Sequence, residues 1–190
     1  MNESQRARPA AGGLGNFLSL LRAYLVLDPL VLLYTFVLGI AALAVSFFDS
    51  SGRRQHAIAQ LWSKMIMGTI LSPVTVIGAE NLEGQRAAIY AANHISAIDI
   101  PLLYSRLPFQ FRIIAKKELF TTPCVGWYLK RSGQLPVDRD NPRASIRSLN
   151  AAVESMQAGT PLVIFPEGGR APDGHIMPFM AGPFYAAIKA

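Results

Sequence analysis

The sequence predicts an α/β fold, in which a mixed sheet flanked by helices follows an N-terminal hydrophobic helix that anchors the chain in a membrane. Two observations support this prediction. From residue 73 onward, short apolar segments alternate with segments of helical periodicity, a pattern typical of α/β sheets. Before them lies an uncharged run of twenty residues, 29–48, long enough for a bilayer core at about 1.5 Å per residue. We therefore expect a flexible polar leader at 1–16, a membrane anchor with an amphipathic helix at 17–72 and the α/β domain at 73–190.

The composition agrees with a membrane-associated protein. Hydrophobic residues make up 51% and charged residues 16% of the 190 positions, whereas charged residues form about a quarter of an average soluble domain. A secretory signal peptide fits poorly, because the apolar run starts late, is long and lacks an evident cleavage site. A buried core helix is the other alternative. Basic residues flank both ends of the run, so the charges predict no orientation, and the run could cross the bilayer or bend back as a hairpin.

The net charge of +6 suits contact with anionic lipid head groups or with an acidic carrier. Nucleic acid is not expected as a partner, because the basic residues are scattered and form no stripe with interleaved aromatic residues. The single cysteine, Cys124, excludes an internal disulfide. Cys124, His56 and His175 lie in no pattern of metal ligands, so we expect no metal site.

A second helix is predicted at 53–71, where apolar residues recur at helical spacing and Pro73 follows. Two placements are open for it. It could lie at the membrane interface, with Trp62 and Lys64 at head-group depth, or it could pack on the core of the domain, and the two placements do not exclude each other.

The remaining elements form the α/β domain. Strands are expected at 74–78, 87–92, 109–115, 134–137 and 161–165. A helix is expected at 97–106, where Ser96 could act as its N-cap. A longer helix is expected at 142–158, because Asn141 and Pro142 form a good N-cap and N1 pair and Gly159 closes it.

The predicted strand 87–92 leads directly into His94, and Asp99 follows five positions later. If a helix begins between them, the two side chains share one face. A histidine can take the proton of an alcohol as it attacks, and a carboxylate on the other ring nitrogen fixes the tautomer. No Gly-x-Ser-x-Gly elbow accompanies the pair, so we expect a substrate hydroxyl to attack a thioester directly, without an acyl-enzyme. The alternative is a hydrogen-bonded structural histidine beside a carboxylate at a helix N-terminus.

A second group of polar residues follows the last predicted strand. Gly168 lets the backbone approach an anion closely, and the guanidinium group of Arg170 can donate two parallel hydrogen bonds to a phosphate. Arg139 could be a second phosphate ligand, and Lys116 and Lys117 could line the same groove. The alternatives are a tight turn with an exposed salt bridge for the first group and solvated strand ends for the others.

Taken together, these segments resemble the lysophosphatidic-acid acyltransferase (PlsC-type) family. The matching segments, in order, are 93–99 with its His-x4-Asp spacing, 115–126, 133–139 and 165–170. The resemblance covers the chain from about residue 71 and implies a glycerolipid acyltransferase-like domain. It implies a membrane enzyme that moves a fatty acyl group from acyl-CoA or acyl carrier protein to the 2-hydroxyl of lysophosphatidic acid, giving phosphatidic acid. Membrane lipids are then partners, and no cofactor is implied besides the acyl donor.

The resemblance also implies roles for individual residues. His94 matches the general base of the family, and Asp99 matches the aspartate that orients it. The positions that match acceptor-binding residues are Arg139, Glu167, Gly168 and Arg170, with a lysine of the Lys116–Lys117 pair near the phosphate.

The sequence departs from the family pattern in two places. Gly169 and Ala171 stand where the third block usually has hydroxyl residues, so hydroxyl contacts are not expected there. The family also has a fourth, proline-containing apolar block downstream, so we expect the α/β domain of these 190 residues to be incomplete at its C-terminus.

Two questions about function stay open at this stage. The acceptor could be glycerol-3-phosphate, a lysophospholipid or a lyso-aminolipid. The protein could also be a non-catalytic membrane lipid-binding protein of the same fold. We expect it in the inner or cytoplasmic membrane, with the active site at the cytoplasmic face.

Overall fold

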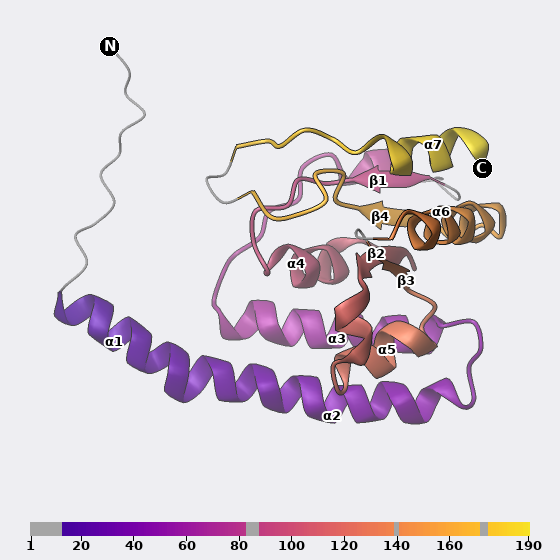
Figure 1. Ribbon diagram of the computed structural model, residues 1–190. Coiled ribbons are helices and arrows are strands. Elements are labelled where there is room, and N and C mark those ends of the chain that lie inside the picture. Colours follow the sequence, from indigo (N-terminus) through magenta and orange to yellow (C-terminus); the bar gives the residue numbers. More distant parts are fainter. Residues whose placement is uncertain (1–12, 83–87, 139–140, 172–174) are drawn as a thin grey trace, which may run out of the picture.

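The computed structural model describes residues 13–82, 88–138, 141–171 and 175–190. One long helix runs along a domain in which helices cover both faces of a sheet (Figure 1). The long helix consists of α1 (Leu14–Arg22), the π-helical turn η1 (Ala23–Leu27) and α2 (Asp28–Ser46). It begins at Leu14, so the last residues of the expected leader are helical, and residues 1–12 lie outside the described part of the chain.

The sheet has four strands in the order β1-β4-β2-β3. The strands are β1 (Ile89–Ala91), β2 (Arg112–Lys116), β3 (Leu135–Val137) and β4 (Leu162–Ile164). The α/β prediction is confirmed, but all pairings in the described residues are parallel, whereas a mixed sheet was expected. The expected strand at 74–78 is wrong: the segment pairs with no described strand and leaves Ile77 92% exposed. Its β-branched residues favour an extended backbone, but a strand also needs a partner.

Helices pack on both faces of the sheet. The connecting elements are α3 (Arg53–Thr69), η2 (Ala79–Leu82), α4 (Asp99–Arg106), η3 (Lys117–Thr121), α5 (Val125–Arg131), α6 (Pro142–Gln157) and α7 (Ala181–Lys189). Because side chains alternate along a strand, Ile113 and Val163 join a core with α3, α4 and α5. Leu162 and Ile164 point the other way, into a second core with α6 and α7. The strands are therefore buried on both faces, as parallel sheets usually are.

Two helix boundaries show how local chemistry sets the elements. The predicted cap of α6 is confirmed, because Asn141 Oδ1 accepts a hydrogen bond from the N–H of Ala144 at 3.1 Å. The helix predicted at 97–106 begins two residues later, at Asp99. The carboxylate of Asp99 accepts N–H groups of the preceding turn. These side-chain hydrogen bonds hold that turn in a non-helical conformation, so the helix starts only at Asp99.

Helix α3 lies between α2 and α4 (Figure 1). It buries polar side chains, among them Gln55, His56 and Ser63. The indole N–H of Trp62 donates to Thr35 Oγ1 of α2 at 3.0 Å, which joins the two helices. The structure confirms that this helix packs on the domain, and its placement at the membrane interface stays a prediction.

The long helix presents an apolar surface to the outside. From Leu14 to Ser46 it is 33 residues long and apolar enough to cross a membrane, and only 6% of its most hydrophobic window is buried. One face of α2 packs on α3 and α5. Large apolar side chains remain exposed along the rest, including Phe17, Leu25 and Phe36. This amount of exposed apolar surface on one element indicates contact with lipid or with another protein.

Candidate active site

The polar residues singled out in the sequence lie at one edge of the sheet. Because all four strands are parallel, their carboxyl ends meet there, as in other open α/β sheets that bind ligands at this edge. His94 follows β1 and Glu167 follows the neighbouring strand β4. Lys116 ends the next strand, β2, and Asp138 follows β3 at the far side.

His94 and Asp99 form a hydrogen-bonded pair. His94 Nδ1 and Asp99 Oδ2 are 2.8 Å apart, and their side chains are 18% and 15% exposed. The same carboxylate oxygen accepts N–H groups of Ile95 and Ser96, each at 2.9 Å. Asp99 stands in the first turn of α4, so the helix start and the two amides hold it in place.

These contacts keep Asp99 charged. Partial burial raises its pKa, but hydrogen bonds from the His94 ring and from the amides of Ser96 and Ile95 outweigh burial. The pKa of Asp99 therefore lies below its usual value of 3.8. An ionised Asp99 at Nδ1 leaves Nε2 of His94 as the nitrogen that can take a proton from a substrate.

The loop 165–171 holds His94 from the other side. The His94 ring stacks on Phe165, with centroids 4.1 Å apart. The backbone carbonyl of His94 accepts the N–H of Ala171 at 2.8 Å. His94 is thus fixed through its ring, its Nδ1 atom and its main chain, a restraint that proton transfer in a defined geometry would require.

The same loop carries three more of the residues singled out in the sequence. Gly168 has φ +74°, and its N–H donates to the carbonyl of Phe165 at 3.0 Å, so glycine permits this turn. Glu167 is buried, and its carboxylate accepts the backbone N–H of His94 at 3.1 Å and of Met177 at 3.0 Å. Arg170 is exposed on the loop, next to Ala171.

The lysines lie on the neighbouring strand. Lys116 Nζ is 3.6 Å from Glu118, and Lys117 Nζ is 2.7 Å from Asp138. The second pair joins the ends of β2 and β3. Arg139 lies outside the described residues. In the described part of the chain, no group of three or more His, Cys, Asp and Glu side chains is placed to hold a metal ion.

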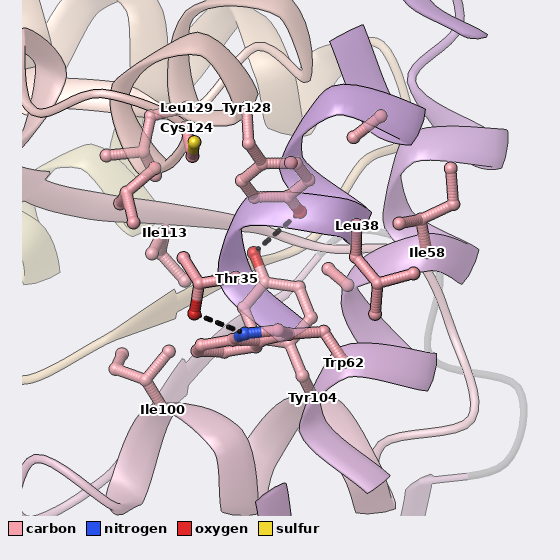
Figure 2. Close-up of a pocket in the computed structure, with 14 residues that line it drawn as sticks. Thr35, Leu38, Ile58, Trp62, Ile100, Tyr104, Ile113, Cys124, Tyr128 and Leu129 are labelled. Carbon is pink, nitrogen blue, oxygen red and sulfur yellow. Dashed lines mark hydrogen bonds between the residues drawn. The ribbon is translucent and has the colours of Figure 1, made fainter. Parts of the chain in front are cut away.

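An apolar cavity of ≈ 110 Å³ lies between α2, α3, α4, α5 and β2 (Figure 2). Its walls include Leu38, Ile58 and Leu129, and the hydroxyls of Tyr104 and Tyr128 are hydrogen-bonded to each other at 3.1 Å beside it (Figure 2). Helix α4 connects the cavity with the polar edge, because Asp99 starts this helix and the next residue, Ile100, lines the cavity.

Sequence reasoning missed the cavity. One signal was available: Thr35, Gly39 and Ala42 recur at helical spacing in the apolar run and all line the cavity. Small residues at that spacing allow close helix packing, and a Cβ on Gly39 would come within 2.7 Å of the Cys124 side chain. Glu167 was noted, but nothing in the sequence pairs it with the main chain of His94.

Comparisons of this sequence and structure with known proteins show which family the chain belongs to. A family model described as Acyltransferase matches residues 73–190. The chain belongs to the acyltransferase family. In structure, this acyltransferase resembles the crystal structure of the 1-acyl-sn-glycerophosphate (LPA) acyltransferase PlsC from Thermotoga maritima, with a TM-score of 0.75 and 29% sequence identity. That likeness covers 92% of this chain and 70% of the other.

Curated relatives carry consistent names. The chloroplastic 1-acyl-sn-glycerol-3-phosphate acyltransferase LPAT1 of Arabidopsis thaliana is 34% identical over 147 residues, 76% of this acyltransferase and 41% of that protein. A 1-acyl-sn-glycerol-3-phosphate acyltransferase of Chlamydomonas reinhardtii is 31% identical over 160 residues, 83% of this chain and 47% of that one. The acyltransferase thus spans less than half of the length of these two relatives.

Proposed function

We propose that this chain transfers a fatty acyl group from a thioester, acyl-CoA or acyl carrier protein, to the 2-hydroxyl of lysophosphatidic acid, giving phosphatidic acid. The observation that carries the proposal is the His94–Asp99 pair, held at 2.8 Å at the carboxyl edge of the sheet. The names of the relatives, all acyltransferases for 1-acyl-sn-glycerol-3-phosphate, support the same substrate.

The chemistry needs one base and no protein nucleophile. Nε2 of His94 takes the proton of the acceptor hydroxyl as its oxygen attacks the thioester carbonyl carbon. Asp99 steadies the imidazolium that forms. The tetrahedral intermediate then expels the thiolate as the C–S bond breaks, and the imidazolium returns its proton to sulfur. The sole cysteine, Cys124, is buried and lines the apolar cavity, so the proposed transfer does not use its thiol.

The acceptor phosphate is held by the cationic side chains of the same edge. Arg170 is exposed on the loop that contacts His94. Lys116 ends β2, the strand next to β4, and Lys117 begins η3. Arg139 lies outside the described residues and stays a predicted phosphate ligand. Guanidinium and ammonium groups close to the base favour an acceptor with a phosphate over an acceptor without one.

The apolar cavity beside α4, at ≈ 110 Å³, takes part of the acyl chain. Its lining is almost wholly hydrocarbon, which suits a fatty acyl chain and offers few partners to a polar ligand. The helix that carries Asp99 also contributes Ile100 and Tyr104 to the cavity, so a chain bound there lies next to the reacting end of the site.

The membrane lies against the exposed apolar surface of α1, η1 and α2. Because α2 stays packed on α3 and α5, a perpendicular crossing by α2 would draw the domain into the hydrocarbon. The long helix therefore lies in one leaflet, with the site at the membrane surface. We propose the cytoplasmic face of the cytoplasmic membrane as the location of the enzyme. In that position the enzyme meets a lipid acceptor and a water-soluble donor together.

The test is an acyl-transfer assay in detergent micelles, with palmitoyl-CoA or palmitoyl-acyl carrier protein as donor. The expected product is phosphatidic acid from lysophosphatidic acid, with much slower transfer to monoacylglycerol, which lacks the phosphate, or to glycerol-3-phosphate. Thiol release should require the acceptor. Release of one equivalent of thiol without acceptor would instead indicate an acyl-enzyme. Absence of transfer to every acceptor would favour a non-catalytic lipid-binding protein.

A further inference from the structure

Glu167 is the most deeply buried charged residue at the polar edge. It is 8% exposed, and its two carboxylate oxygens face two different parts of the chain. Oε1 accepts the backbone N–H of His94 at 3.1 Å, and Oε2 accepts the backbone N–H of Met177 at 3.0 Å. A charged carboxylate can be buried only when such N–H donors replace the hydrogen bonds to water that burial removes.

These contacts fit poorly with direct binding of the acceptor. Both oxygens already serve main-chain donors, and the side chain offers little surface to a ligand. A carboxylate also repels a phosphate. Arg170, three residues further on and exposed, has the charge and the accessibility that phosphate binding requires.

The contacts instead fix the base. The backbone N–H of His94 donates to Glu167, and the backbone carbonyl of His94 accepts the N–H of Ala171. The loop 165–171 therefore holds the main chain of the base through both its N–H and its carbonyl. The loop is in turn tied to the segment 175–180. Met177 donates to Glu167, and the N–H of Met180 donates to the carbonyl of Pro166 at 2.8 Å.

We propose that Glu167 is a positioning residue: it holds the main chain of His94 in register with Asp99 and locks the segment 175–180 to the base, and it is not a ligand of the acceptor. This inference rests on the proposed function. Because a small misplacement of a catalytic group can cost about 100-fold in rate, the role predicts a loss in kcat rather than in acceptor binding.

The decisive variant is Glu167→Gln. Glutamine has the same shape, but its NH₂ group would face a backbone N–H donor, so one of the two hydrogen bonds is lost. We expect kcat to fall about 10- to 100-fold while KM for lysophosphatidic acid changes less than about threefold. Arg170→Gln should give the opposite result, a higher KM with a smaller change in kcat. A Glu167→Gln variant with raised KM and unchanged kcat would overturn the proposal.

A matched control separates positioning from a general loss of stability. Gln134 is likewise buried, and its Oε1 accepts the backbone N–H of Ile113 at 2.7 Å, between β2 and β3. Gln134→Ala should lower the unfolding temperature but leave kcat per folded molecule unchanged. If both variants lose kcat in proportion to stability, Glu167 has only a structural role.

A second readout does not depend on turnover. In protein labelled with ¹⁵N-histidine, the imidazole signals of His94, assigned with His94→Gln, should shift or broaden in Glu167→Gln while those of His56 stay unchanged. Unchanged His94 signals would overturn the proposal. If the wild-type protein makes no phosphatidic acid but the signals of His94 respond, the proposed function fails and the positioning role stands.

Discussion

The buried histidine His56 predicts how the stability of this protein depends on pH. His56 lies in α3 and is 5% exposed, with its ring 4.9 Å from Phe111 and 5.1 Å from Tyr104 between centroids. Burial disfavours the charged imidazolium, and nearby Arg112 adds repulsion. The pKa of His56 falls from 6.5 to about 4.

The sign and size of the effect follow from proton linkage. Between pH 6.5 and pH 4 the unfolded chain binds a proton at His56 and the folded chain does not, so acid favours unfolding. Integrated from pH 7 to pH 5, this group alone costs about 2 kcal/mol of folding free energy. For a chain of this size, that corresponds to a fall of about 4–8 °C in the unfolding temperature.

The assay is thermal unfolding in a non-ionic detergent at pH 7 and pH 5. His56→Leu is similar in size and does not titrate, so it should lose about 4–8 °C less than the wild-type protein over this interval. The control is His175→Leu, which removes an exposed histidine and leaves His56 in place. An equal loss in wild-type and His56→Leu protein would refute the reasoning.

Two further predictions concern packing and the catalytic pair. Gly126→Ala should destabilise the fold by about 1–3 kcal/mol, because its Cβ would meet the backbone carbonyl of Phe120, whereas Gly68→Ala, with nothing within 4 Å, should stabilise α3 by about 0.5–1 kcal/mol. Denaturant titration measures both, and equal shifts would contradict the packing argument. Asp99→Asn should lower kcat by a factor on the order of 10³ to 10⁴, because an amide can present N–H to Nδ1 and favour the wrong tautomer. Steady-state thiol release measures it, and a loss below tenfold would show that Asp99 does not orient the base.

The sequence predicted the elements whose signals are local. Asn141 and Gly159 mark the ends of α6 correctly, because caps act within one turn. The strand expected at 74–78 fails for the opposite reason, since pairing depends on a neighbour that a local pattern does not reveal. The parallel arrangement of the described strands likewise depends on the crossover connections rather than on any single strand.

The contrast between local signals and long-range contacts also applies to the residues of the site. The pairing of His94 with Asp99 is confirmed, but no helix begins between them: α4 starts at Asp99 itself, and the non-helical residues 95–98 join the two side chains. Glu167 lies 73 positions from His94, and only the adjacency of β1 and β4 brings its carboxylate to the backbone of the base. The apolar cavity is built from helices and strands across the chain, so its residues could be recognised as core but not as the wall of one space.

The central claim is that His94 removes the proton of the acceptor hydroxyl. The most direct measurement compares phosphatidic acid formation by the wild-type protein and by His94→Ala in the same micelles, with the thermal unfolding of both recorded. We predict that the variant folds but loses turnover by a factor on the order of 10³ or more, since the substitution removes the imidazole that takes the proton. A folded His94→Ala variant that keeps more than about a tenth of the wild-type rate would contradict the account.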